Sequence, residues 1–125
     1  MLLMVIVQTL WNLLIHVSKY FSKKVLIDGY KFDSKKESEY YLYLKSELKK
    51  GLIYDLELQK EYILQESFKI GTKTRRKITY KADFSYKTTK DDKLHVVDVK
   101  GFKTEVYRLK KKLFEKRYEI ELEEI

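Results

Sequence analysis

The spacing of apolar residues between residues 19 and 66 changes along the chain, and each spacing predicts a different element. Apolar residues on both sides of Asp28-Gly29 predict a small hairpin over Lys23–Phe32, with the Asp-Gly pair as its turn. Ser34 and Glu37 then have the spacing of a capping box that opens a helix. Gly51 follows two lysines and ends this helix. Its buried stripe recurs at helical spacing and consists of Tyr40, Tyr41, Leu44 and Leu48.

The middle of the chain predicts strands and a basic turn. Apolar residues from Leu52 to Glu66 indicate one strand or two, and Gln59 interrupts the run as a solvent-facing residue would. Residues 69–77 are basic around Gly71, and we expect the tip of a hairpin there. This tip is either a solvated loop or a segment that touches a phosphate backbone through Arg75 and Arg76.

A second helix and a closing strand are predicted after Gly101. The helix runs from about Thr104 to Tyr118, with an inner stripe of Val106, Leu109 and Leu113, joined by Phe102. Lysines and arginines cover much of the rest of this helix. Residues 119–125 alternate acidic and apolar residues, which fits a short strand with one wet face. The predicted order is therefore helix, antiparallel strands, helix and strand.

Two predicted strands between these helices carry acids where a core strand would carry apolar residues. The first covers Thr79–Tyr86 and has Asp83 near its middle, and the second covers Leu94–Gly101. In the second strand, Asp98 and Lys100 share a face because side chains alternate along a strand. If the two strands pair as a hairpin, both carboxylates and the ammonium converge at one end of a sheet. Converging hard oxygen donors favour Mg²⁺.

Composition narrows the possible partners. A chain of 125 residues forms one modest core, and a formal charge of +8 with pI near 9.4 favours an anionic partner, most commonly nucleic acid. No cysteine is present, so disulfides and thiolate sites are excluded. The only histidines, His16 and His95, argue against a His-rich metal site or a Ser-His-Asp triad.

Residues 1–17 are mostly apolar and differ from the rest of the chain, which we interpret as a single domain over residues 18–125. The segment is short for a membrane span and lacks the basic start of a signal peptide. Three interpretations stay open: a short helix packing on the domain or on another protomer, a membrane anchor, and an extension added by gene calling. The packed helix is favoured over the membrane anchor, so we expect no membrane association.

The order of these motifs resembles the PD-(D/E)XK nuclease superfamily. The resemblance rests on Ala82-Asp83-Phe84, Asp98-Val99-Lys100-Gly101 and the upstream Ser34-x-x-Glu37, each on the expected element. From about Lys23 to the C-terminus, the chain is similar to a small phage-borne group within that superfamily. Ala82 stands where the superfamily's name has proline, a change that reduces loop rigidity and removes no metal ligand. The resemblance implies an α/β fold with a restriction-endonuclease-like core, in which helices flank a mixed, mostly antiparallel sheet.

The resemblance also implies a role for each motif residue. Asp83 and Asp98 would hold Mg²⁺ or Mn²⁺ together with the backbone carbonyl of Val99. Lys100 would orient the attacking water and stabilise charge on the transition state. Glu37 would contact a second metal or a metal-bound water, although it can equally be only a capping residue, in which case Glu39 is its substitute. Residues assigned to substrate binding are Gln59, Arg75, Arg76, Lys103 and Lys110.

Three classes of function follow from these residues. The first is a Mg²⁺-dependent DNA endonuclease without a small-molecule cofactor, encoded by a phage or prophage and acting in the bacterial cytoplasm. Branched or junction DNA is a candidate substrate, and junction resolution would require a homodimer. The second is a nucleic-acid-binding module on the same fold that has lost cleavage. Independently of this class, Asp98 and Lys100 have the alternative of a same-face surface ion pair. The third, a membrane-associated or structural interaction protein, rests only on residues 1–17.

Overall fold

The structure is a computed structural model that describes residue 6, residues 24–99 and residues 102–125. The chain divides into two compact units, residues 1–42 and residues 43–125. Apart from Ile6, the predicted N-terminal extension lies outside the described residues. In the part of the chain that is described, no helix combines the length and apolar character that crossing a membrane requires.

A small hairpin forms the described start of the first unit. β1 (Val25–Ile27) pairs antiparallel with β2 (Tyr30–Phe32), which confirms the predicted hairpin. Asp28 and Gly29 have φ values of 52° and 81°, so both turn residues are left-handed, as the tight turns of two-residue hairpins require. The Tyr41 hydroxyl donates to Asp28 Oδ2 at 2.9 Å, which ties this turn to the following helix.

α2 (Lys35–Lys49) begins and ends where the sequence predicts. The Glu37 N–H donates to Ser34 Oγ at 3.1 Å, so Ser34 caps the helix. The buried stripe includes Tyr41 and Leu44, as predicted, but Leu48 is 41% exposed. Three residues after Leu44, Glu47 is half-buried instead, so the covered face of the helix continues through Glu47.

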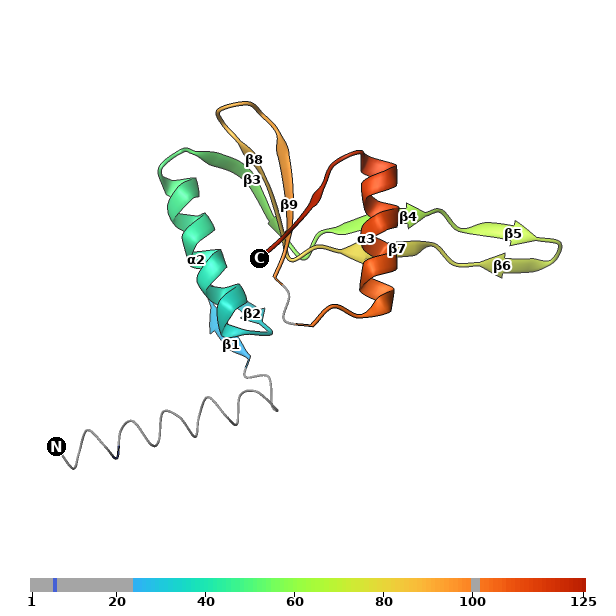
Figure 1. Ribbon diagram of the computed structural model, residues 1–125, viewed down its shortest axis with the longest axis horizontal. Coiled ribbons are helices and arrows are strands. Elements are labelled where there is room, and N and C mark those ends of the chain that lie inside the picture. Colours follow the sequence, from blue (N-terminus) through green and yellow to red (C-terminus); the bar gives the residue numbers. More distant parts are fainter. Residues whose placement is uncertain (1–5, 7–23, 100–101) are drawn as a thin grey trace. The chain divides into compact units, whose positions relative to one another are not determined.

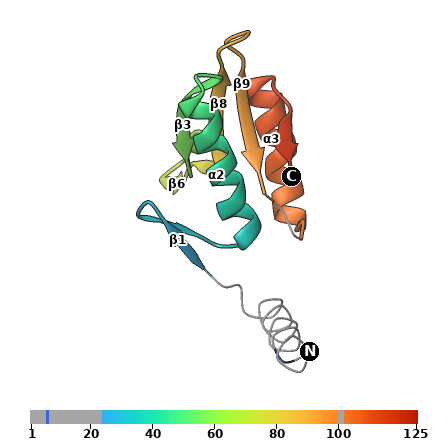
Figure 2. The same cartoon turned by 90° about the vertical axis from the view of Figure 1, so that its left-hand side faces the viewer.

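A four-stranded sheet forms the centre of the second unit. Its order is β10 (Leu122–Glu124), β9 (Leu94–Asp98), β8 (Phe84–Thr88) and β3 (Ile53–Leu58). β8 is antiparallel to both β3 and β9, and β10 is parallel to β9. Figure 2 shows β3, β8 and β9 side by side. The predicted α/β class with a mixed, mostly antiparallel sheet is therefore confirmed.

Two further strand pairs of the second unit extend from this sheet and end in an exposed hairpin (Figure 1). β4 (Glu61–Gln65) pairs with β7 (Ile78–Lys81), and farther out β5 (Phe68–Ile70) pairs with β6 (Lys73–Arg75). Gly71 has φ 58° at the tip, so the predicted basic hairpin tip is confirmed. We call residues 65–78 the arm.

α3 (Glu105–Tyr118) is capped by Thr104, whose side chain accepts from the Tyr107 N–H at 3.1 Å. This start agrees with the prediction, but the predicted inner stripe is wrong. Val106 and Leu109 are 64% and 58% exposed, whereas Tyr107 and Phe114 are buried. Each buried aromatic follows a predicted apolar position by one residue, which turns the buried face by about 100°. The helix therefore packs through rings and leaves its aliphatic stripe exposed, together with Phe102.

These rings form the core of the second unit with residues of β4, β7, β9 and β10. Phe114 is fully buried, with its ring centroid 5.2 Å from that of Tyr62 and 5.7 Å from that of Tyr80. Among the described residues, the buried cluster consists of Tyr62, Leu64, Tyr80, Ala82, Val96, Tyr107, Phe114 and Leu122. This core connects the β4–β7 strand pair, the four-stranded sheet and α3 around the end of β9.

Candidate active site

Asp83 lies at a break between two strands. The predicted continuous strand over Thr79–Tyr86 is wrong, because β7 ends at Lys81 and β8 starts at Phe84. The chain changes partner at this break, from β4 on one side to β3 and β9 on the other. Asp83 therefore lies where the β4–β7 strand pair meets the four-stranded sheet.

Hydrogen bonds from two other segments fix the half-buried Asp83. The Val99 N–H donates to Asp83 Oδ2 at 2.8 Å, and Gln59 Nε2 donates to Oδ1 at 3.3 Å. Gln59 is left-handed, with φ 56°, and its own N–H donates to the Asp83 carbonyl oxygen at 3.1 Å. Because Phe84 pairs with Val97, one further step of the same register places Asp83 opposite Asp98. Asp83 and Asp98 thus lie at the same end of the β8–β9 hairpin.

Asp98 is the last residue of β9 and is 1% exposed. The buried Tyr80 hydroxyl donates to Asp98 Oδ2. The Asp98 carbonyl oxygen accepts from the Ile125 N–H at 3.0 Å, just beyond β10. A buried carboxylate requires such partners, because an ionised group loses its hydration on burial. Tyr80 therefore links the aromatic core to the carboxylate pair.

The charges of both acids influence the pKa values of two tyrosines. Burial raises the pKa of Tyr80 above its usual value, and the hydrogen bond and charge of Asp98 add to this, with a smaller part from Asp83. Burial likewise raises the pKa of Tyr107, with contributions from the charges of Asp98, Glu124 and Asp83. Both phenols therefore stay protonated at neutral pH and serve as hydrogen-bond donors.

Glu124 forms a second anchor beside this pair, since it is the register partner of Asp98 across the parallel strands. It accepts hydrogen bonds from the Tyr107 hydroxyl at 3.1 Å and from Lys111, and it forms an ion pair with Lys103 at 3.2 Å. The Lys111 hydrogen bond contributes most to lowering the pKa of Glu124 to about 2. The network ties α3 and the segment before it to the edge strand next to Asp98.

The remaining predicted site residues are placed as follows. Lys100, assigned to catalysis, lies outside the described residues. Glu37 is buried in the first turn of α2, within the first unit, and its alternative Glu39 forms an exposed ion pair with Lys35 at 3.8 Å. Glu39 therefore has the ordinary role of an i,i+4 helix partner.

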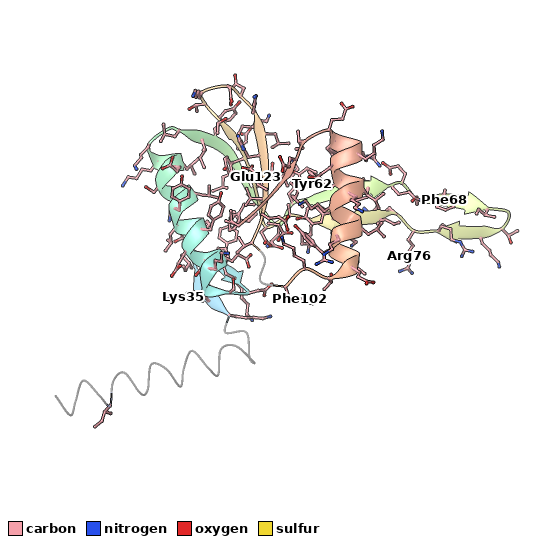
Figure 3. The ribbon with its side chains drawn as sticks, in the orientation of Figure 1. Lys35, Tyr62, Phe68, Arg76, Phe102 and Glu123 are labelled. Atoms are coloured by element: carbon pink, nitrogen blue, oxygen red, sulfur yellow. The ribbon has the colours of Figure 1, made fainter. Side chains whose placement is uncertain are left out.

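The predicted substrate-binding residues fall into two groups. Gln59 contacts Asp83, Lys103 reaches Glu124, and Lys110 is half-buried on α3. Arg75 and Arg76 do not join the carboxylates, because they belong to the exposed arm (Figure 3 labels Arg76).

Among the described residues, His95 does not join this site. The Nδ1 atom of His95 lies 2.9 Å from Glu123 Oε2, and its ring stacks on Tyr86 with centroids 5.2 Å apart. His95 lies three residues before Asp98 on β9, so alternation directs it to the other face of the sheet. Sequence reasoning did not assign Tyr80, Tyr107 or Glu124 to the site, because their partners are known only once the strands are paired.

The carboxylate oxygens at the site suit a hard divalent cation as ligands. Within the described residues, no cluster of three or more His, Cys, Asp or Glu side chains gathers as a metal site. Mg²⁺ does not require a cluster of three side chains, because it binds through one or two carboxylates and keeps several waters. Asp83 and Asp98 supply two such carboxylates. The groups that donate hydrogen bonds to them include the Val99 N–H, the Gln59 amide and the Tyr80 hydroxyl, all of which are neutral.

The chain matches a protein family model. A family model described as "Protein of unknown function (DUF1064)" covers residues 17–124 of the chain. No match was found among curated proteins or among solved structures.

Proposed function

The chain belongs to the DUF1064 family, and we propose that it is a metal-dependent endonuclease that hydrolyses phosphodiester bonds in DNA. The observation that carries this proposal is the hydrogen bond from the Val99 N–H to Asp83 Oδ2 at 2.8 Å, because it brings Asp83 next to the residue that follows Asp98. The α/β unit with its mixed sheet suits a restriction-endonuclease-like core, in which a hairpin presents the acids. The net charge of +8 favours a polyanionic substrate.

The proposed roles of the residues follow from their contacts. The Val99 N–H and the Gln59 amide keep the Asp83 carboxylate in one orientation, and the Tyr80 hydroxyl does the same for Asp98. The carboxylates would hold Mg²⁺ or Mn²⁺, which when bound supplies a Lewis acid and lowers the pKa of a coordinated water. Lys100, two residues after Asp98, would stabilise negative charge on the phosphate in the transition state.

The cleavage assay uses supercoiled, linear and branched DNA with Mg²⁺, with Mn²⁺ or with EDTA. We expect cutting only with a metal, and we expect Asp83→Asn and Lys100→Ala to abolish it while leaving binding largely intact. Glu37→Gln tests the predicted fourth residue. Asp55→Asn is the matched control, because Asp55 is exposed and its left-handed φ of 53° suits asparagine.

Two results would count against the proposal. One is DNA binding without cutting in either metal, which would indicate a binding module. The other is cutting that survives Asp83→Asn. Branched DNA is included because a phage enzyme acting in replication or recombination in the bacterial cytoplasm would meet such substrates, and a homodimer would be required to cut both strands of a junction.

A further inference from the structure

The arm is firmly attached at its base and exposed beyond it. The Tyr118 hydroxyl donates to the Ile63 carbonyl oxygen at 2.9 Å, and Arg117 forms an ion pair with Glu66 at 3.3 Å, so α3 holds both β4 and the start of the arm. Residues 65–78 are all exposed. Strands rise about 3.3 Å per residue, so the arm reaches about 20 Å from its base to the tip at Gly71. Figure 1 shows it extending away from α3.

The arm concentrates positive charge. It has five cations against one acid, so these 14 residues account for +4 of the formal +8 of the chain. The acid is Glu66, which is already paired with Arg117 at the base. The cations are Lys69, Lys73, Arg75, Arg76 and Lys77.

One face of the hairpin combines cations with apolar side chains. Phe68 pairs with Arg75, and Ile70 pairs with Lys73. Directly opposed residues share a face, as do residues two apart, so these four side chains lie together. Phe68 is 40% exposed and Ile70 is 61% exposed (Figure 3 labels Phe68). Apolar residues on a strand face usually cover a core, but this face lies against no core of the described unit.

We propose that the arm lies in the major groove of duplex DNA, with Lys73 and Arg75 on phosphates and with Phe68 and Ile70 against the groove. Charge complementarity selects the polyanion. Width favours the major groove, because at about 12 Å it admits a two-stranded β-ribbon in undeformed DNA, whereas a minor groove about 6 Å wide has to be opened by bending the duplex. This inference rests on the proposed function, since it specifies the form of DNA that the nuclease binds.

The test measures binding without cleavage. Fluorescence anisotropy in EDTA gives the Kd of the full chain for a duplex of about 20 base pairs and for a single strand of the same sequence. Lys73→Ala/Arg75→Ala should raise the duplex Kd about tenfold and reduce the slope of log Kd against log salt by about 2. Lys90→Ala/Lys93→Ala is the matched control, with two exposed cations in the β8–β9 turn, and should change neither value.

Phe68→Ser tests the apolar part of the proposed contact. It should weaken duplex binding while leaving the salt slope unchanged, because no phosphate contact is lost. Circular dichroism melts verify that each variant is folded. We expect folding to be retained, because the substituted side chains are exposed.

Any of three outcomes would overturn the inference: duplex binding by the arm variant within twofold of wild type, an equal loss of single-strand binding, or no DNA binding by the wild type. The outcome for cleavage is separate. If the arm variant loses duplex binding but the wild type never cuts DNA, the arm inference stands and the proposed function fails. If the wild type cuts DNA and the arm variant binds normally, the arm inference alone fails.

Discussion

Glu124→Gln tests how the edge strand beside Asp98 is held to α3. The substitution removes the charge but keeps an oxygen that accepts from the Tyr107 hydroxyl, so the loss reports mainly on the lysines. We expect the variant to be less stable than wild type at pH 7. The difference should shrink as the solution becomes acidic.

The magnitude follows from the carboxyl pKa of Glu124, which falls from 4.5 to about 2. Because the folded value is the lower one, the stabilisation is complete above the unfolded pKa and is lost as pH falls through about 2. A shift of this size corresponds to about 3–4 kcal/mol before solvent screening. The Lys103 side chain is 47% exposed, and solvent screening reduces the expected loss at pH 7 to about 1–2 kcal/mol.

Urea unfolding followed by circular dichroism at several pH values between about 7 and about 3 measures this difference. Glu121→Gln is the matched control, because Glu121 is an exposed acid just before β10. It should change the free energy of unfolding by less than about 0.5 kcal/mol. A Glu124→Gln loss that stays constant down to about pH 3, or no loss at pH 7, would refute the reasoning.

Three further substitutions test the supports of the site by urea unfolding. Phe114→Ala should cost about 3–5 kcal/mol, because a fully buried ring is replaced by a cavity in the aromatic cluster; a cost below about 1 kcal/mol would contradict this packing. Tyr80→Phe should cost about 1.5–3 kcal/mol, because the buried Asp98 carboxylate loses a hydroxyl donor; an unchanged stability would exclude that bond. Asp83→Ala should cost about 1–3 kcal/mol because the Val99 N–H loses its acceptor, whereas Asp83→Asn retains an acceptor and should cost less; equal costs would contradict this role for the N–H.

Local signals in the sequence predicted the parts of the fold that depend on neighbouring residues. The Asp28-Gly29 turn and the Ser34 cap both require a residue type at a fixed offset, and the structure has both. The face of α3 that is buried could not be predicted from such local signals. Aliphatic and aromatic residues offered two competing apolar stripes, and the choice depended on rings from β4 and β7 that pack against Phe114.

The candidate site likewise combines residues that the sequence identified with features that it could not predict. The order of the motifs predicted Asp83 and Asp98 as candidate metal ligands. The break of the strand before Phe84 was not predictable from that segment alone, because it arises where the chain leaves β4 to pair with β3. The supporting role of Tyr80 was hidden for the same reason, since it depends on a partner 18 residues away in the chain.

The most direct test of the central claim, that Asp83 and Asp98 together hold a divalent cation, is Mn²⁺ binding by the full chain. The electron paramagnetic resonance signal of free Mn²⁺ reports it without DNA. We predict saturable binding by the wild type and by Asp55→Asn, with affinity reduced at least about tenfold in Asp83→Asn. Equal Mn²⁺ affinity in the wild type and Asp83→Asn, or no binding by the wild type, would contradict the account.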